Sequence, residues 1–478
     1  MTSEQRWDAV VVGSGPNGLA AGITLARAGR SVVVLEANPT IGGGARSAAL
    51  TLPGFVHDLC SAVHPLGASS PAFARWPLKE HGLEWIQPPV AVAHPLDDGS
   101  AALVRQNLDA TAGQLGADGE AYRRLVGPVA RDWPLIATDL LGPFRPGRIA
   151  RHPFRFARFG WHALQPATAL ARRFATPQAR ALLGGVAAHS FLRFDRAVSG
   201  GFALVLLGAA HSAGWPFARG GSQAITDALA AYLRSLGGEI RSGCKVTRME
   251  DLPSHRSVLF DVTPRQLLAI AGDRLRGSYA AQLRRFRYGP GVFKLDLALS
   301  EPIPWANPEV GEAGTVHLGG SFEEVAAAAR SVARGRVSER PFVLLAQPSR
   351  FDPGRAPDAR HTAWAYCHVP NGSGADMTEP ILAQVERFAP GFRKLIIGRS
   401  AMDAAAVEFH NANHVGGDIN GGLASLTQLL TRPAIRPDPY TTPDPTIFIC
   451  SASTPPGGGV HGLCGYHAAR SVLRRALR

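Results

Sequence analysis

A glycine-rich turn between a buried strand and a helix is the feature that most constrains the fold of this chain. Residues 7–12 (WDAVVV) have the pattern of a short buried strand, and Gly-Ser-Gly-Pro-Asn-Gly follows at residues 13–18. Apolar residues at helical spacing continue to Ala28, and a second apolar run, Ser31 to Leu35, ends in Glu36. This order predicts a βαβ unit that opens a Rossmann-like α/β fold and binds a dinucleotide.

Each residue of this turn has a physical reason to be there. Gly13 permits the tight turn, Gly15 lets the backbone approach a pyrophosphate, and Gly18 lets helix and strand pack closely. The start of the helix offers unpaired N–H groups to the phosphates, and Glu36 accepts hydrogen bonds from a ribose hydroxyl. The predicted cofactor contacts are therefore Gly13, Gly15, Pro16, Asn17, Gly18 and Glu36. This motif alone does not distinguish FAD from NAD.

A second glycine-rich turn follows closely after Glu36 in the sequence. Residues 39–47 read PTIGGGARS, and this stretch resembles the second motif of the flavoprotein family that includes phytoene desaturases and flavin amine oxidases. The resemblance implies that FAD is the cofactor and that Gly43, Gly44 and Arg46 contact it. A glycine loop without a ligand is the alternative interpretation.

The C-terminus carries a similar arrangement. Thr446 to Cys450 is predicted as a buried strand, a glycine-rich segment runs from Ser451 to Gly462, and a helix is predicted over Gly465 to Leu477. This stretch is similar to the C-terminal FAD motif of bacterial phytoene desaturases, which implies that Ser451, Gly459 and Val460 line the flavin. His461 stands where those enzymes commonly have proline, and both a catalytic and a structural role stay open for it.

The middle of the chain supplies a third part of the predicted nucleotide domain. Gly220-Gly221-Ser222 opens a helix predicted over Gln223 to Leu236, and a strand is predicted from Glu239 to Met249. By resemblance to the family, Val246 contacts the adenine. A further strand is predicted at Ser257 to Val262. Members of the family usually carry a β-meander between these two strands. Here only Glu250 to Arg256 separates them, so we expect the meander to be missing or minimal.

These segments predict an FAD-binding domain of the glutathione-reductase type built from residues 1–70, 215–265 and 435–478. An interleaved α+β substrate domain, with a lid and a mixed sheet, is predicted from residues 71–214 and 266–434. The chain most resembles the branch labelled pyridine nucleotide-disulfide oxidoreductase domain-containing protein 2. However, near the flavin motifs it has only Cys60 and no cysteine pair, and no second G-x-G-x-x-G opens a mid-chain helix. We therefore expect neither disulfide chemistry nor a separate nicotinamide domain.

Lys294 is the main catalytic candidate, with His461 as the second. The segment GPGVFKLDLAL, Gly289 to Leu299, alternates as a strand that places Lys294 and Asp296 on one face. With the following PIPW it resembles flavin amine oxidases, in which a lysine on the matching strand reaches flavin N5 through a water. An exposed strand face carrying a Lys–Asp pair is the alternative. No histidine spacing indicates a metal site.

The net charge of +13 comes from 46 Arg and 4 Lys. Because this skew, with abundant Ala, Gly and Pro, is typical of coding bias, we do not expect nucleic-acid binding. Between Asp139 and Asp195 there are nine arginines and no acid; Arg145, Arg148, Arg151, Arg155 and Arg158 alternate with Phe144, Phe154, Phe156, Phe159 and Trp161. This segment, in full residues 145–193, predicts either an anionic membrane contact or a solvated lid.

The cysteine content and the N-terminal residues favour an intracellular location. Five cysteines without a C-x-x-C pair fit a reducing compartment. Residues 1–6 show no signal-peptide pattern, and the longest apolar run, Phe202 to Ala210, is too short to cross a membrane. We expect a cytoplasmic protein, with peripheral membrane contact as an addition.

The predicted activity is FAD-dependent oxidation or saturation of a C–C bond in a hydrophobic, isoprenoid-like substrate, with quinone or oxygen as electron acceptor. Amine oxidation is the second interpretation, although the aromatic pair that amine oxidases need is not identifiable in the sequence. A flavoprotein that acts mainly by binding partners is the third.

Overall fold

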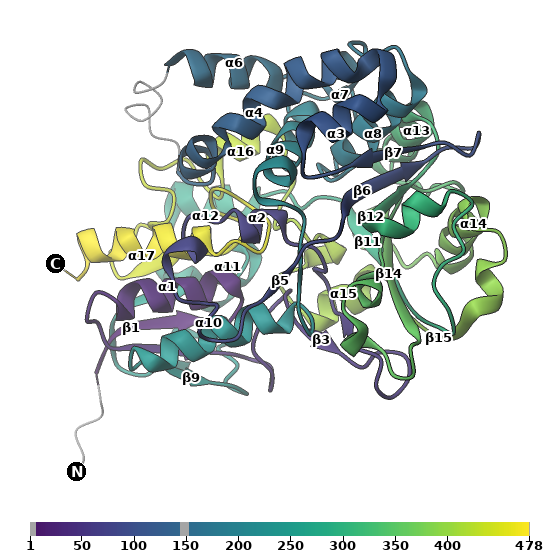
Figure 1. The fold of residues 1–478 in the computed structure, drawn as a ribbon. Helices are drawn as coiled ribbons and strands as arrows, with labels where there is room; N and C mark the ends of the chain where they lie inside the picture. Colours follow the sequence, from purple (N-terminus) through teal and green to yellow (C-terminus); the bar gives the residue numbers. More distant parts are fainter. Residues whose placement is uncertain (1–5, 144–152, 478) are drawn as a thin grey trace.

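The protein folds around two β-sheets that lie side by side (Figure 1). The computed structural model describes residues 6–143 and 153–477. One sheet is parallel and has five strands, and the other is mixed and has seven. There are also two small two-stranded sheets. One pairs β3 (Ser47–Ala48) with the nearby β4 (His57–Asp58), and the other pairs β5 (Trp85–Ile86) with β8 (Phe217–Ala218), which is distant in the sequence. The predicted α/β class with a Rossmann-like sheet is confirmed.

The parallel sheet contains the first glycine turn. Three of its strands, WDAVVV, VVVL and IFI, are short and largely apolar, which is typical of parallel strands buried on both faces. In spatial order they are β16 (Ile447–Ile449), β10 (His255–Phe260), β1 (Trp7–Val12), β2 (Val32–Leu35) and β9 (Glu239–Arg241).

Helices cover both faces of this sheet. Ala9, Val11 and Val34 point toward α1 (Pro16–Ala26), α10 (Gln223–Ser235) and α17 (Leu463–Arg475). On the opposite face, Val10 and Val258 pack against α11 (Pro264–Ala271) and α12 (Gly277–Arg284). Helices α1 and α17 lie beside each other, so the two ends of the chain meet on one face (Figure 1).

The mixed sheet packs one face of β11 (Gly291–Leu299) against an apolar core. Its strands, in spatial order, are β15 (Ile396–Met402), β11, β14 (His361–Val369), β13 (Val343–Ala346), β12 (Ala313–Leu318), β6 (Val90–Pro95) and β7 (Ala101–Val104). Phe293, Leu295 and Leu297 face the core that contains α14 (Thr378–Phe388). The predicted alternation along β11 is therefore confirmed.

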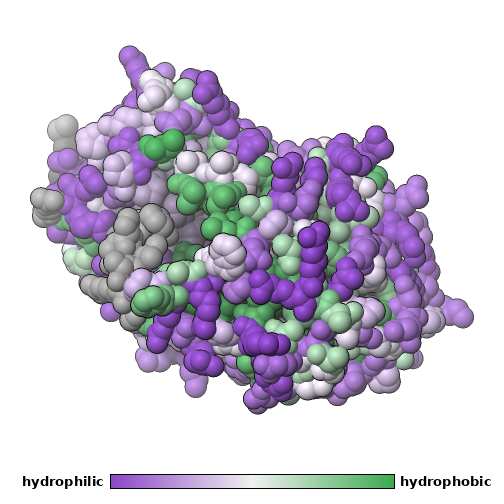
Figure 2. Space-filling view, turned by 90° about the horizontal axis from the view of Figure 1, so that it is seen from above, coloured by the Kyte–Doolittle hydropathy of each residue, from purple (hydrophilic) through white to green (hydrophobic). Residues whose placement is uncertain are grey.

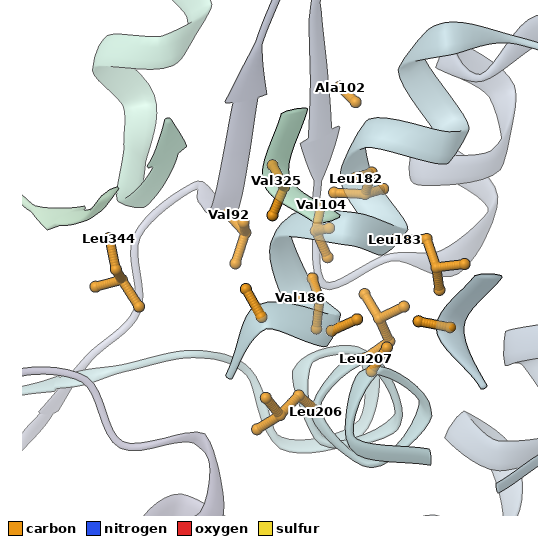
Figure 3. Packing of buried hydrophobic residues seen from close by; sticks show 14 of the residues in the cluster. Val92, Ala102, Val104, Leu182, Leu183, Val186, Leu206, Leu207, Val325 and Leu344 are labelled. Carbon is orange, nitrogen blue, oxygen red and sulfur yellow. The ribbon is translucent and has the colours of Figure 1, made fainter. Parts of the chain in front are cut away.

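The other face of the mixed sheet lies beneath a layer of helices. Val92, Val104 and Leu344 pack there against Val186 and Leu206, which lie on different helices (Figure 3). The helices of this layer are α3 (Leu108–Gln114), α4 (Gly119–Leu140), α6 (Pro153–Ala163), α7 (Ala167–Ala171), α8 (Pro177–Ala188), α9 (Ser199–Ala213) and α13 (Phe322–Ala333). Among the residues described, no helix is both long enough and apolar enough to span a bilayer.

Three shorter helices complete the connections: α2 (Pro65–Ala68), α15 (Ala404–His410) and α16 (Leu426–Thr431). The most precise sequence predictions are β1 and the start of α10, whose bounds agree to the residue. The predicted strand from Glu239 to Met249 is wrong beyond Arg241. There Gly243 adopts a φ of +72° and the chain turns back along the loop after β2, where the Cys244 amide donates to the Glu36 carbonyl at 2.7 Å.

The described residues between β9 and β10 contain only a single 3₁₀ turn, Met249–Asp251, and no β-meander. The strands of the parallel sheet come from residues 1–70, 215–265 and 435–478, and those of the mixed sheet come from the two remaining segments. Each sheet therefore takes its strands from the segments that were predicted to form one domain. The exact domain boundaries stay a prediction.

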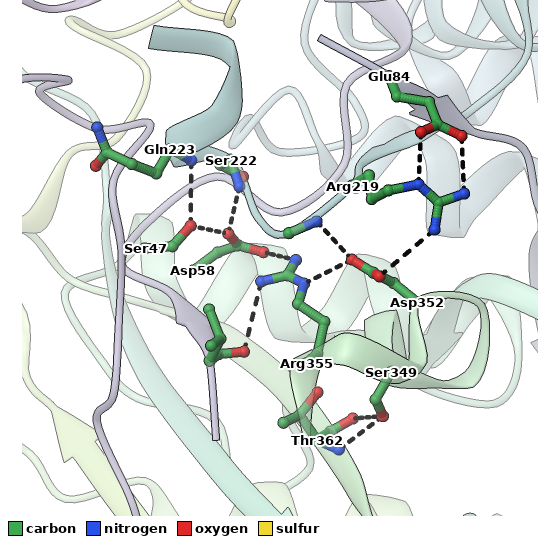
Figure 4. A network of polar contacts seen from close by, with 12 residues as sticks. Ser47, Asp58, Glu84, Arg219, Ser222, Gln223, Ser349, Asp352, Arg355 and Thr362 are labelled. Atoms are coloured by element: carbon green, nitrogen blue, oxygen red, sulfur yellow. Dashed lines mark hydrogen bonds and ion pairs between the residues drawn. The ribbon is translucent and has the colours of Figure 1, made fainter. Parts of the chain in front are cut away.

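A buried ion pair ties the two parts together (Figure 4). The Arg355 guanidinium donates to Asp58 at 2.7 Å, and both side chains are almost fully buried. Asp58 also accepts from the Ser222 amide at 2.7 Å, at the start of α10, and from the Ser47 hydroxyl at 2.7 Å. Because Arg355 belongs to the mixed-sheet side and α10 to the parallel-sheet side, this network fixes how the sheets meet.

Candidate functional site

One cavity of about 570 Å³ lies at the carboxyl ends of β1, β2, β10 and β16 and extends to the mixed sheet. In open parallel sheets this edge is where ligands bind. All three predicted glycine turns contribute to its wall, together with the loop that holds Val246. The predicted cofactor residues that line it are Gly13, Gly15, Pro16, Asn17, Glu36, Gly43, Gly44, Val246, Ser451, Gly459 and Val460.

The first turn has the close packing that its glycines predict. A Cβ on Gly18 would lie 1.9 Å from the Gly13 carbonyl oxygen, so only glycine lets α1 start this close to β1. Gly18 does not line the cavity; its amide donates to the Asp261 carboxylate at 2.9 Å. Asn17 does line it, and its Oδ1 is buried without a hydrogen-bond partner in the structure. An unpartnered buried acceptor facing a cavity indicates a ligand or a water there.

The second turn lies directly against the first. A Cβ on Gly43, where φ is +56°, would be 3.0 Å from the Gly15 Cα. Arg46 lies outside the main cavity. Its Nε donates to the Gly43 carbonyl at 2.9 Å and its Nη2 donates to the His410 carbonyl. Arg46 therefore holds the glycine turn in place from behind.

The third turn brings the end of the chain to the same wall. A Cβ on Gly465 would lie 1.7 Å from the Asn17 carbonyl oxygen, so α17 packs against the start of α1. His461, by contrast, is not among the residues that line the cavity. Its Nδ1 accepts from the Leu463 amide at 3.0 Å, which caps the start of α17. The geometry gives His461 this capping contact, and its catalytic role stays a prediction.

Glu36 lies at the nucleotide end of the cavity, and both of its carboxylate oxygens accept hydrogen bonds. Its Oε2 accepts from the Ser14 hydroxyl at 2.6 Å and the Ser14 amide at 3.0 Å, and Oε1 accepts from the Asn38 amide at 2.9 Å. These bonds fix the carboxylate at the end of β2, where the first motif requires an acceptor for a ribose hydroxyl.

Asp261 is a site residue that the sequence analysis missed. It follows β10 directly, and β10 pairs with β1 in register Phe260–Val12, so its carboxylate reaches the N-terminus of α1. Burial, with the Gly18 amide acting against it and the charge of Glu36 adding to it, raises the pKa of Asp261 to about 7. The sequence prediction placed Asp261 inside the strand predicted from Ser257 to Val262, whereas β10 ends at Phe260, so this position was not recognised as lying at the carboxyl end of a strand.

The end of the cavity near the mixed sheet is largely apolar. It is lined by Phe191, Phe202, Leu206, Trp215, Leu344, Trp364, Tyr366 and Ile419. Trp364 and Tyr366 lie two residues apart on β14, with ring centroids 5.3 Å apart and nearly perpendicular planes. Among the described lining residues the only carboxylates are Glu36 and Asp261, both at the nucleotide end.

Lys294 borders a second, water-sized cavity of about 20 Å³ that shares Gly44, Cys60 and Trp364 with the main one. Its Nζ donates to Asp296 Oδ2, and both side chains are buried, so the alternative of an exposed strand face is wrong. His57 Nδ1 lies 3.6 Å from Asp296 Oδ1. Burial raises the pKa of Asp296 to about 6 although Lys294 lowers it, and burial lowers that of His57 to about 3.

These observations fit a dinucleotide that carries a flavin. Asn17 Oδ1 and Ser453 Oγ are buried side-chain atoms of cavity residues and have no partner in the structure. Cys60 and Cys244 both line the cavity, but neither forms a disulfide, and every one of the five cysteines is a free thiol.

Comparison with known proteins gives the same picture. Residues 11–76 match the family described as "NAD(P)-binding Rossmann-like domain". Pyridine nucleotide-disulfide oxidoreductase domain-containing protein 2 of Rattus norvegicus is 24% identical over 98% of this chain and 93% of its own. An oxidoreductase from Methanosarcina mazei has a similar structure, with a TM-score of 0.66, 16% identity, and coverage of 98% of this chain and 99% of its own.

Wild-type putrescine oxidase bound to putrescine has a TM-score of 0.62 and 18% identity, with coverage of 99% of this chain and 98% of its own. At these identities the two solved structures establish the fold. The similarity to the rat protein runs from end to end at 24% identity, and the three glycine turns surround one cavity, as a dinucleotide-dependent oxidoreductase of this fold requires.

Proposed function

We propose that the protein is an FAD-dependent oxidoreductase that dehydrogenates or saturates a C–C bond of an apolar, isoprenoid-like substrate. The observation that carries the proposal is the apolar end of the cavity, whose described lining has aromatic and aliphatic side chains and no carboxylate. Such a lining favours a neutral hydrophobic ligand, because a charged ligand would lose its hydration without gaining a partner.

The nucleotide end supplies the groups that would hold FAD. With FAD bound, the start of α1 would lie at the pyrophosphate, Glu36 at the ribose and Val246 at the adenine; all three segments line the cavity. Gly43, Gly44, Ser451, Gly459 and Val460 would line the remaining length. Bound FAD supplies two-electron chemistry that the side chains of the protein lack.

Lys294 is the proposed proton-handling group. It is buried, paired with Asp296, and borders a cavity large enough for one water. An ammonium held by a buried carboxylate can orient a water and exchange a proton with it, which a guanidinium does not do at neutral pH.

Amine oxidation is the second candidate. The Trp364–Tyr366 pair in the cavity wall supports it, because amine oxidases need an aromatic pair at the substrate. The sequence alone did not identify this pair. The structural neighbour is named as a putrescine oxidase. The lack of a carboxylate in the apolar end weighs against a dication, so an amine substrate would have to be monovalent and largely apolar.

Flavin bleaching distinguishes these candidates. Under anaerobic conditions, the purified holoprotein is mixed with polyenes, steroids and monoamines of matched carbon number, and the absorbance near 450 nm is followed. Rapid bleaching by a polyene or steroid alone supports the proposal, and bleaching by an amine alone supports the second candidate. If no compound bleaches the flavin and the protein retains a stable partner on isolation, a partner-binding role is favoured. Reoxidation by oxygen compared with a soluble quinone then identifies the electron acceptor.

We further propose that α6 contacts an anionic membrane surface at which a cytoplasmic protein of this kind would meet its substrate. Phe154 and Trp161 on α6 are 89% and 69% exposed, whereas Phe159 is buried. Arg155 and Arg158 lie on the same helix, each within 4.0 Å of Asp132. On this side of the molecule apolar side chains gather in a hollow bordered by hydrophilic ones (Figure 2). Phe144, Arg145, Arg148 and Arg151 lie outside the described residues.

A further inference from the structure

Three histidines lie behind the apolar end of the cavity. His94 on β6 and His317 on β12 are neighbours across a parallel pair of strands, next to the registered pair Ala93–Val316. His189 directly follows α8 and lines the cavity. The rings of His189 and His317 have centroids 5.0 Å apart, and the edge of His189 meets Trp215 at 5.8 Å.

Hydrogen bonds connect only part of this cluster. His189 Nε2 and His317 Nε2 are 2.9 Å apart, and His94 Nε2 is 2.7 Å from the Gly320 carbonyl oxygen. The Nδ1 atoms of His94 and His317 are buried without a partner in the structure. Both lie against Gly185, where a Cβ would be 2.6 Å from one and 2.7 Å from the other. Nδ1 of His189 has no hydrogen bond to the described residues, and its ring borders the cavity.

These contacts determine where the protons are. A carbonyl only accepts, so His94 carries its proton on Nε2 and leaves a lone pair on Nδ1. For His317, a proton on Nδ1 would be a buried N–H without an acceptor, which proteins avoid more strictly than an unused lone pair. His317 therefore carries its proton on Nε2 and donates it to His189 Nε2. Neutral His189, whose Nε2 accepts, must then carry its own proton on Nδ1.

The cluster is neutral at physiological pH. Burial lowers the pKa of His189 and of His94 to about 4, and that of His317 well below its ordinary value. Nothing in the described residues groups three or more His, Cys, Asp or Glu side chains so that they could hold a metal ion. The three imidazoles thus act through hydrogen bonds, and their unsatisfied nitrogens impose a cost in stability that a purely apolar filling would avoid.

We propose that His189 presents an Nδ1–H donor to the substrate and so selects, among apolar molecules, those that carry a hydrogen-bond-accepting oxygen. His317 is a positioning residue that fixes the tautomer of His189, and Gly185 leaves room for the ring of His317. The inference rests on the proposed function, since it assumes that this end of the cavity receives the apolar substrate. It also disfavours a protonated amine at this position, because an ammonium only donates hydrogen bonds.

The tautomers can be observed directly. Full-length protein labelled with ¹⁵N-histidine is examined at pH 7 by long-range ¹H–¹⁵N correlation, with His189→Phe used to assign the signal. We expect His189 protonated on Nδ1 only and His317 on Nε2 only. In His317→Phe, the His189 signal should shift toward a mixture of tautomers. Gly184→Ala is the control: its added methyl group contacts Phe322 and no histidine, so the His189 signal should stay unchanged. A His189 ring protonated on Nε2, or on both nitrogens, would overturn the inference.

Binding of a matched ligand pair tests selectivity without turnover. Dissociation constants of cyclododecanone and cyclododecane are measured with the holoprotein by ligand-induced changes in the visible spectrum. The ketone should bind about fivefold more tightly, which is the factor that one average hydrogen bond gives. His189→Phe should abolish this preference, whereas Leu206→Ala should weaken the binding of both ligands by the same factor. Equal binding by the wild type, or a preference that survives in His189→Phe, contradicts the role of His189. If neither ligand binds, the proposed substrate class fails, while the tautomer of His189 is still decided by NMR.

Discussion

The Asp261 carboxylate accepts a hydrogen bond from the Gly18 amide at 2.9 Å, which places a buried acid at the N-terminus of α1. A Cβ on Gly15 would lie 2.9 Å from the same carboxylate oxygen, so the acid borders the position where the pyrophosphate of a dinucleotide is expected. In the free protein this carboxylate satisfies part of the helix N-terminus. It also places an ionisable group beside a dianionic ligand.

The affinity for FAD should therefore fall as the pH rises. Burial raises the pKa of Asp261 to about 7, so the group is protonated below that pH and negatively charged above it. Binding of the pyrophosphate favours the protonated form and takes up a proton, and the dissociation constant should rise between pH 7 and 9 by up to about tenfold per unit. Flavin fluorescence quenching measures it.

Asp261→Asn keeps an acceptor for Gly18 and removes the charge, so its dissociation constant should be independent of pH over this range. Glu250→Gln removes an exposed acid of the same domain and should retain the wild-type slope. A wild-type slope in Asp261→Asn would assign the titration to another group.

Substitution of Lys294 should slow the chemistry. Lys294→Met removes the proposed proton-exchange group, and flavin reduction and reoxidation in stopped-flow experiments should slow by about 10²-fold. Lys294→Arg keeps the charge and should be slow as well. Lys394→Met, an exposed lysine, is the control. Because Lys294→Met leaves Asp296 buried without its partner, folding is checked by circular dichroism. If the single variant does not fold, the double variant Lys294→Met/Asp296→Leu is measured in its place. Wild-type rates in folded Lys294→Met would exclude the role.

Loss of Arg355 should destabilise the protein far more than loss of an exposed arginine. Burial opposes ionisation of Asp58, but Arg355 beside it holds the pKa of Asp58 below its ordinary value. Arg355→Leu leaves this charge buried, and the free energy of unfolding in urea should fall by about 3–5 kcal/mol. Arg219→Ala breaks a more exposed pair with Glu84 and should cost less than about 1 kcal/mol. Equal losses would mean that the network in Figure 4 does not hold the sheets together.

Binding to anionic liposomes should depend on α6. Phe154→Glu/Trp161→Glu introduces charge at two strongly exposed aromatic positions and should abolish co-sedimentation with phosphatidylserine vesicles at low salt. Phe409→Glu changes an aromatic residue that is 88% exposed on another helix, α15, and should have no effect. If the wild type does not sediment at any ionic strength, the membrane proposal is wrong.

The cofactor end of the site was predictable from the sequence because close backbone packing requires glycine. A Cβ on Gly18 would lie 1.9 Å from a backbone oxygen, which no other residue permits, and Gly43 combines a close approach of 3.0 Å with a φ of +56°; such positions leave a local pattern. Alternation along β11 likewise predicted which face carries Lys294. The strand predicted to Met249 was too long because apolar alternation continues past Gly243, whose left-handed backbone ends the pairing.

The substrate end could not be predicted, since its residues come from distant segments. His94, His189 and His317 meet only because β6 pairs with β12 and because the end of α8 packs against this pair at Gly185. Asp261 reaches Gly18 only through the pairing of β10 with β1. No sequence spacing encodes these contacts, which arise from sheet order and helix packing.

The visible spectrum of the purified, folded protein decides whether it binds a flavin. We expect absorption bands near 370 and 450 nm, release of FAD on denaturation, and recovery of the bands when FAD is added back to the stripped protein. A folded protein that is colourless and does not bind added FAD would contradict the claim that the turns at Gly13–Gly18, Gly43–Gly44 and Gly457–Gly459 hold one dinucleotide.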